Sequence, residues 1–218
     1  MDWSAIVHNA PDLAVGLWLT VRLALVSACT ALAFGALLAW GLQKGQFWLQ
    51  SSVRAYIDFI LGLPMLVLMY LLFFILPEYG ITLSSPMVGV TALTLYYGPY
   101  LGEVLRAAFG AIPQGQYEAC AALGLRPFEA LCRVLLKQAL PVALPPSVGL
   151  LIGLIKDTAL LSVVGVEEFM YAAKQAISTS YAPLEIYLVV AIAYWLITLL
   201  LDSAAGFIER RLNRHRIA

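Results

Sequence analysis

Five long apolar stretches constrain the fold of this chain more than any other feature of its sequence. A transmembrane helix needs about 20 consecutive, mostly apolar residues. Water-soluble domains carry about 25% charged residues, whereas only 12% of these 218 residues are charged and 62% are hydrophobic. We therefore predict an all-α, polytopic integral membrane protein in a lipid bilayer. Its five predicted spans are residues 13–42, 56–76, 87–109, 142–164 and 184–208.

Two of the predicted spans depart from a simple straight helix. Residues 13–42 are more than a bilayer requires, so we predict that this helix is tilted or extends past the lipid. Pro64 lies inside the second span and should kink it, because proline removes a helix hydrogen bond and clashes with the preceding turn. The chain contains no soluble domain, low-complexity linker or repeat that we detect. Residues 1–218 are therefore predicted to form a single transmembrane domain.

The basic residues of the connections predict the orientation, because cytoplasmic connections carry an excess of Lys and Arg. The second connection, residues 77–86, has none, and the fourth has only Lys174, offset by Glu167 and Glu168. The other connections and the C-terminal tail hold Lys44, Arg54, Arg126, Arg133, Lys137, Arg210, Arg211, Arg214 and Arg216. Five spans with the N-terminus outside and the C-terminus inside satisfy every connection and place the third one in the cytoplasm.

The third connection contains residues that typically start and end helices. Pro113 suits the first turn of a helix, and Gly124 can take the left-handed conformation that ends one. Pro127 then restarts a second helix, which we expect to end near Leu140, before Pro141. Two short amphipathic helices joined at a glycine are typical of an element that docks on another protein.

The residues of this connection resemble the EAA loop of ABC-importer permeases. Glu118-Ala119-Cys120 is followed after three residues by Gly124, and after nine more by Val134, a spacer and Leu136. The wider text, residues 112–116 and 138–140, is similar to the polar-amino-acid uptake branch of that family, and the resemblance extends from about Gly16 to Arg211. Two positions depart from the family pattern: Cys120 stands where Ala is usual, and Lys137 where Pro is usual.

The resemblance implies the membrane-spanning subunit of an ABC importer in a bacterial cytoplasmic (inner) membrane, which takes up a polar amino acid or a related small solute. It implies two ATP-binding subunits, a second permease chain, identical or homologous, and an external or periplasmic solute-binding protein. ATP and Mg would be bound by the ATPase, so this chain needs no cofactor and catalyses no bond change. Residues 113–140 would form the cytoplasmic coupling loop. Its ATPase contacts are predicted at Glu118, Ala119, Cys120, Ala121, Ala122 and Gly124.

Charged residues inside a predicted span mark a candidate solute site, since each costs about 2.5–3.5 kcal/mol to insert. Lys156 and Asp157 interrupt the fourth span. They could lie near its outer end and reach the headgroups. Alternatively, Asp157 and Thr158 could face a polar cavity between subunits and help bind a zwitterionic or cationic solute. Lys-Asp-Thr followed by a small residue is also a signature of the family that the chain resembles, so we predict the solute site near Asp157, Thr158 and Leu161.

The segment before the predicted kink departs from the family pattern. Amino-acid permeases usually read Arg-Gly-Thr-Pro here, whereas this chain reads Leu61-Gly62-Leu63-Pro64. The bend is kept, but two polar side chains are lost. If Gly62, Leu63 and Pro64 help to form the solute path, two explanations stay open. The chain pairs with a different permease that supplies the polar groups, or it accepts a less polar solute.

Glu103 and Arg106 lie three residues apart on one helical face, where they can pair. Such a pair is either structural or part of a gate or pathway. The neighbouring Tyr96 and Tyr97, before Gly98 and Pro99, are predicted to pack around a bend.

Several classes of function lack support in the sequence. No Gly-x-x-x-x-Gly-Lys-Ser/Thr motif occurs, so ATP binding by a Walker loop is excluded. The formal net charge is zero and no basic patch is interleaved with aromatics, which argues against nucleic-acid binding. The three cysteines lack paired spacing and are predicted to be free thiols, with no metal site. A stand-alone secondary carrier or channel, coupled to an ion gradient through Asp157 or Glu103, is the alternative, but it leaves the third connection without a purpose.

Overall fold

The structure, a computed structural model, describes residues 3–213 of the chain, without the side chains of Lys44, Leu212 and Asn213. Arg214 and Arg216, which entered the orientation argument, lie outside the described residues. All regular structure in the described part is helical, which confirms the predicted all-α class. The elements are α1 (Ser4–Lys44), α2 (Phe47–Leu61), α3 (Met65–Glu78), α4 (Ser85–Gly110), α5 (Gln114–Ala122), α6 (Pro127–Ala130), η1 (Leu131–Leu135), α7 (Leu136–Asp157), η2 (Thr158–Val164), α8 (Phe169–Ser180) and α9 (Pro183–Asn213).

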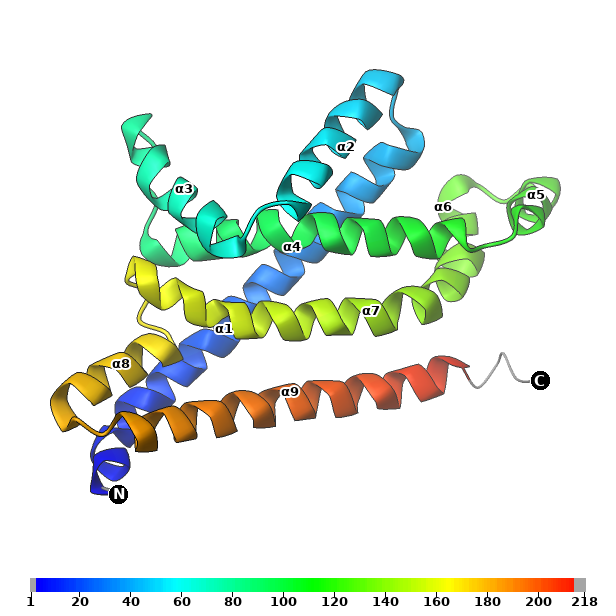
Figure 1. The fold of residues 1–218 in the computed structure, drawn as a ribbon. Helices are drawn as coiled ribbons and strands as arrows, with labels where there is room; N and C mark the ends of the chain where they lie inside the picture. The colour runs from blue at the N-terminus through cyan, green and yellow to red at the C-terminus, as the bar shows by residue number, and fades with distance from the viewer. Residues whose placement is uncertain (1–2, 214–218) are drawn as a thin grey trace.

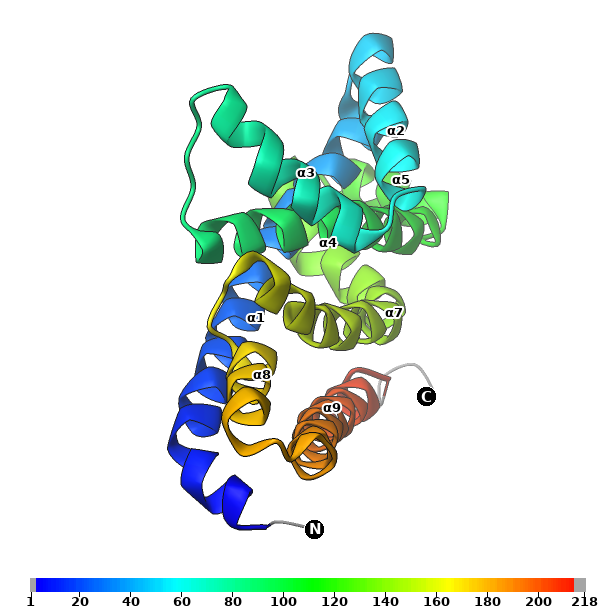
Figure 2. The ribbon, with the colours of Figure 1, turned by 60° about the vertical axis from the view of Figure 1, so that its left-hand side comes forward.

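Three long helices, α4, α7 and α9, run side by side, and α1 crosses them obliquely (Figure 1). Figure 2 shows α2 and α3 beyond α4 on one side of this row and α9 on the other, with α7 between α4 and α9. The loop that carries α5 and α6 lies at one end of the row. Helix α8 and the start of α1 lie at the opposite end (Figure 1).

The crossing of α1 and α4 is closely packed because glycines meet there. A β-carbon added to Gly35 would lie 2.7 Å from the carbonyl oxygen of Gly98 and 2.9 Å from the backbone nitrogen of Gly102. Small residues allow helix backbones to approach in this way inside a membrane. The hydroxyl groups of Thr30 and Thr94 add a hydrogen bond across the same crossing. The main apolar core continues from this crossing to α3, α7 and η2.

The predicted spans all fall on helices, but the count of five stays a prediction. Among the described residues, three helices are individually long and apolar enough to cross a bilayer: Ser4–Gln43, Pro127–Val164 and Pro183–Arg211. The first covers 40 residues, which confirms that it exceeds what a bilayer requires. The pair α2 and α3 would be a fourth span if it is counted as one. Helix α4 has 26 residues and carries the charged Glu103 and Arg106.

The second predicted span is interrupted, and not only kinked as we predicted. Helix α2 ends at Leu61 and α3 begins at Met65, and the two axes differ by 108°. The amides of Gly62 and Leu63 close the end of α2 by bonding to the carbonyls three residues back. Pro64 disfavours a helical conformation for the residue before it and has no N–H to donate. The segment is therefore two helices with a break, not one bent helix.

The predicted helix end before Pro141 was wrong. The helix that starts at Pro127 continues through the π-helical turn η1 and along α7 to Asp157, with Pro141, Pro145 and Pro146 inside it. Prolines are tolerated within membrane helices because neighbouring helices and local changes of helix type satisfy the freed backbone groups. The coupling loop therefore contains one separate short helix, α5, followed by the start of a long one.

Candidate functional site

Helix α5 lies within residues 113–140, the predicted coupling loop. It starts directly after Pro113 and ends at Ala122, two residues before Gly124, whose φ is +67°. The amide of Gly124 bonds to the carbonyl of Ala121 at 3.0 Å, and the amide of Leu125 to that of Cys120 at 3.1 Å. This left-handed glycine closure of a helix end confirms the turn predicted at Gly124.

The predicted ATPase-contact residues divide between two faces of α5. Cys120 is buried against the rest of the protein, whereas the others are exposed. Because Cys120 points inward, its departure from the family pattern changes the packing of α5 and not its outer surface. The exposed members are Glu118, Ala119, Ala121, Ala122 and Gly124.

Polar contacts fix α5 to the helices on both sides of it. The Tyr117 hydroxyl donates to the carbonyl oxygen of Phe109, at the end of α4, at 3.0 Å. The side-chain amide of Gln138, on α7, donates to Gln116 at 3.0 Å. Partial burial raises the pKa of Tyr117, so its hydroxyl stays a protonated donor at neutral pH. Movement of α5 is thereby tied to both α4 and α7.

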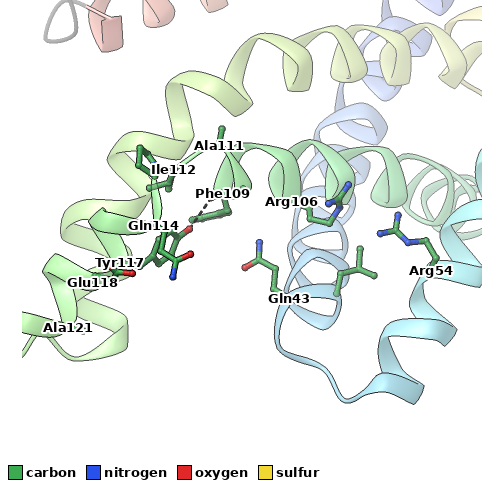
Figure 3. Close-up of a pocket in the computed structure, with 13 residues that line it drawn as sticks. Gln43, Arg54, Arg106, Phe109, Ala111, Ile112, Gln114, Tyr117, Glu118 and Ala121 are labelled. Atoms are coloured by element: carbon green, nitrogen blue, oxygen red, sulfur yellow. Dashed lines mark hydrogen bonds between the residues drawn. The ribbon is translucent and has the colours of Figure 1, made fainter.

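A cavity of about 1010 Å³ lies between α5, the ends of α1 and α4, and the middle of α2; we call it the α5 cavity (Figure 3). Its lining is partly charged and partly apolar. It comprises Leu42, Gln43, Arg54, Arg106, Phe109, Gly110, Ala111, Ile112, Pro113, Gln114, Tyr117, Glu118 and Ala121.

Glu103 joins two arginines beside this cavity. Its Oε2 accepts from Nε and Nη2 of Arg106 at 2.8 and 2.6 Å, which confirms the predicted pair. Its Oε1 accepts from Nη1 of Arg54 at 2.9 Å. Sequence reasoning placed Arg54 in a connection, but the structure places it in the middle of α2, so this second ion pair was missed. The carboxylate of Glu103 thus ties α2 to α4.

Asp157 ends α7 beside a group of tyrosines from α4. The Tyr97 hydroxyl donates to Oδ2 of Asp157 at 2.8 Å. The ring centroids of Tyr96 and Tyr100 lie 5.4 Å apart, and those of Tyr96 and Tyr97 also 5.4 Å. Gly153, one turn before Asp157, leaves room for the Tyr97 hydroxyl, which lies 3.0 Å from where its β-carbon would be. A half-buried carboxylate with aromatic faces beside it is suited to a cationic amine.

The sequence did not reveal the role of these tyrosines. We predicted that Tyr96 and Tyr97 pack around a bend, and the structure adds a polar contact from Tyr97 to a residue 60 positions away. The spacing of Tyr96, Tyr97 and Tyr100 indicates that they cluster along one helix, but no local signal names Asp157 as the partner.

The other two residues of the predicted solute site lie in the protein core. Thr158 is fully buried and donates to the carbonyl oxygen of Ile155 at 2.7 Å. Leu161 is fully buried and packs on Gly89, whose added β-carbon would lie 2.7 Å from a Leu161 methyl group. Of the predicted trio, only Asp157 is partly exposed in this conformation, and the adjacent Lys156 is exposed.

The break between α2 and α3 lies beside the same core. Gly62 and Pro64 are exposed and Leu63 is half-buried. Met65, the first residue of α3, belongs to the core cluster that contains Tyr97 and Leu161. The structure thus brings the two predicted parts of the solute path close to one apolar cluster.

Glu168 is a buried carboxylate that the sequence analysis treated as a loop charge. It is 0% exposed and caps α8, accepting from the amides of Met170 at 3.0 Å and Tyr171 at 2.9 Å. The hydroxyls of Thr20, on α1, and Tyr194, on α9, also donate to it, at 3.2 and 3.5 Å. Burial raises the pKa of Glu168, although these four donors oppose the rise. One side chain therefore holds α1, α8 and α9 together.

We expect Glu168→Gln to lower the thermal stability of the purified protein. The amide group of Gln replaces one acceptor oxygen by a donor and faces groups that themselves donate, which costs about 1–3 kcal/mol. For a chain of this size each kcal/mol corresponds to about 2–4 °C in Tm. The matched control is Glu167→Gln, on the exposed neighbouring residue. Equal Tm values for the two variants would contradict the role of Glu168 in joining the three helices.

No group of three or more His, Cys, Asp or Glu side chains within residues 3–213 is placed to hold a metal ion.

The family model and the similar proteins that match this chain all describe membrane components of transport systems. Residues 31–214 match the family described as binding-protein-dependent transport system inner membrane component. The chain is 32% identical to the probable amino-acid permease protein YxeN of Bacillus subtilis (strain 168), over 98% of this chain and 97% of that protein. It is also 32% identical to the L-cystine transport system permease protein TcyB of the same organism, over 94% of this chain and 88% of that protein.

Solved structures agree with this fold. A chain in the crystal structure of an amino acid ABC transporter with histidines superposes with a TM-score of 0.87 at 27% identity, covering 97% of this chain and 99% of that one. A chain of the MetNI methionine ABC transporter, in an inward-facing conformation, superposes with a TM-score of 0.77. Its identity of 22% supports the fold alone, with coverage of 98% of this chain and 100% of that chain.

Proposed function

The chain belongs to the binding-protein-dependent transport system inner membrane component family, and from this premise we propose that it forms half of the path of a polar amino acid, or a closely related small solute, through an ABC importer. It is a multi-pass protein of the cytoplasmic membrane and a transport subunit, not an enzyme. Family membership favours this function over the alternative of a stand-alone carrier or channel.

We propose that the partners are a second permease chain, two ATP-binding subunits and an external or periplasmic solute-binding protein. ATP and Mg would be bound by the ATPase subunits. The exposed side chain of Glu118 and the small Ala119, Ala121 and Ala122 would seat α5 in a cleft of the ATPase, where small side chains allow close approach. The buried Cys120 would hold α5 against its own subunit.

One observation carries the proposed mechanism: a helix runs without a break from the coupling loop to the candidate solute site. It starts at Pro127, continues through η1 and ends at Asp157, which corresponds to roughly 45 Å at 1.5 Å per residue. When the ATPases close on ATP, movement of α5 would reach this helix through the contact of Gln116 with Gln138. The far end of the helix, with Asp157, would then shift relative to α4.

The solute would bind differently in the two states that this movement connects. A ligand or ATP can shift such an equilibrium only through a difference in affinity for the two states. Here the Tyr97 hydroxyl and the amine of a solute would compete for the carboxylate of Asp157. The tyrosine rings of α4 would supply the faces against which a cationic amine packs. Leu63 would contribute no polar contact from this subunit.

Purification of the chain from its native membrane in mild detergent tests the assignment of partners. We expect a P-loop ATPase to co-purify with the wild-type chain and to be lost from Glu118→Lys. If a second, different permease chain co-purifies, that chain could provide the polar side chains that are absent at Leu61 and Leu63. Failure to recover an ATPase under several gentle conditions, together with uptake that stops with an uncoupler, would favour the carrier function instead.

A further inference from the structure

Two arginines form a wall of the α5 cavity that the transport mechanism above does not use. The side chains of Arg54 and Arg106 line the cavity and are 47% and 40% exposed. They come from different helices, α2 and α4, and Figure 3 shows both guanidinium groups on the side of the cavity away from α5. Glu103 is not part of the lining and accepts hydrogen bonds from both.

In this arrangement several N–H donors of the two cavity-lining guanidinium groups make no hydrogen bond to another described residue. A guanidinium has five N–H donors. The hydrogen bonds of Arg54 use only Nη1, and those of Arg106 use Nε and Nη2. One carboxylate also cannot neutralise two guanidinium charges, so the cluster keeps about one positive charge. Glu118 lies on the α5 side of the cavity, with Tyr117 beside it (Figure 3). The wall formed by Arg54 and Arg106, on the side of the cavity away from Glu118, is suited to an oxyanion (Figure 3).

The aromatic residues near the cavity indicate its depth in the membrane. Trp40, at the end of α1, is 62% exposed, and Phe47 and Trp48, at the start of α2, are 73% and 79% exposed. Exposed aromatic side chains gather at the headgroup level of a bilayer. They flank the turn between α1 and α2, next to Leu42 and Gln43 of the cavity lining. The cavity thus opens where lipid phosphates lie.

We propose that the α5 cavity binds the headgroup of an anionic phospholipid. Its phosphate oxygens accept hydrogen bonds from Arg54 and Arg106, because the fork of a guanidinium matches phosphate geometry. The apolar side chains of Leu42, Phe109 and Ile112 in the same lining contact the first carbons of an acyl chain. The lipid then lies between α2, α4 and the coupling helix, independently of which solute is transported.

Native mass spectrometry of the purified permease complex tests this site, with dioleoyl phosphatidylglycerol, dioleoyl phosphatidylcholine or inorganic phosphate as the probe. We expect the wild-type complex to bind phosphatidylglycerol about tenfold more tightly than phosphatidylcholine. This preference corresponds to a difference of about 1.4 kcal/mol in binding free energy. The combined change Arg54→Gln, Glu103→Gln and Arg106→Gln should abolish this preference. It removes all three charges, so no carboxylate is left unpaired. Arg22→Gln, on an exposed arginine of α1, is the matched control and should keep the preference.

The outcomes separate the possible sources of the oxyanion. An equal preference for phosphatidylglycerol in the triple variant and the wild type would overturn the proposal. So would binding of inorganic phosphate to the wild type without any preference between the two lipids, since the cavity would then take a free anion. If the triple variant does not fold, Arg54→Lys provides the second test: it keeps the charge but not the fork, and should weaken the preference without removing it.

Discussion

Charge reversal at Glu118 is expected to abolish ATP-driven solute uptake while membrane insertion is unchanged. The side chain is exposed at the tip of the coupling loop, and the helix that carries it is tied to α4 and α7. Placing the wrong charge in a desolvated contact with a partner costs about 2–5 kcal/mol. Since each 1.4 kcal/mol is a factor of ten in affinity, we expect Glu118→Lys to reduce uptake by at least about 25-fold in reconstituted vesicles.

The control for this experiment is Glu209→Lys, which makes the same change near the end of α9, outside the coupling loop. We expect Glu209→Lys to keep most of the uptake and to co-purify with the ATPase. The Glu118→Lys protein should be recovered from the membrane in wild-type amounts, because Glu118 is exposed and lies outside the protein core. Normal uptake by Glu118→Lys would argue against docking through α5.

Removal of the carboxylate at Asp157 is expected to reduce solute-stimulated ATP hydrolysis more than basal hydrolysis. A hydrogen bond to a charged group contributes about 1.5–3 kcal/mol, so Asp157→Ala should weaken the response to the solute by roughly 10- to 150-fold. We expect basal hydrolysis to depend on the ATPase and on residues 113–140, the proposed coupling loop, whose helix α5 lies at the other end of α7 from Asp157 (Figure 1). The measurement is ATPase activity of the reconstituted complex at increasing solute, with and without the binding protein.

Tyr97→Phe is the comparison for Asp157→Ala. It removes the hydroxyl that bonds to Oδ2 but keeps the carboxylate and the ring. We expect it to change the solute response by less than tenfold, because the carboxylate remains available to the amine. Equal loss of basal and stimulated hydrolysis in Asp157→Ala would show that Asp157 has only a structural role at the junction of α7 and η2.

Features that depend on residues close together in the sequence could be predicted from the sequence. The apolar stretches indicated the helices of a membrane protein, because span length follows from bilayer thickness. The left-handed turn at Gly124 followed from the freedom of glycine, and the pairing of Glu103 with Arg106 from helical spacing. A local helix-ending signal was nevertheless misleading at Pro141, which lies inside α7, just after the π-helical turn η1. Neighbouring helices and local changes of helix type allow a proline inside a membrane helix.

Contacts between distant segments were decided only by the tertiary structure. No local pattern distinguishes Glu167, which is exposed, from Glu168, which is buried at the junction of three helices. The pairing of Arg54 with Glu103 and of Tyr97 with Asp157 likewise depends on which helices pack together. The sequence by itself determined the membrane helices, because they follow from composition, and its residues carried the resemblance to the family that the comparisons then showed. The partners of its buried charges were determined by packing, because a polar group taken out of water needs partners that the crossing angles of helices bring within reach.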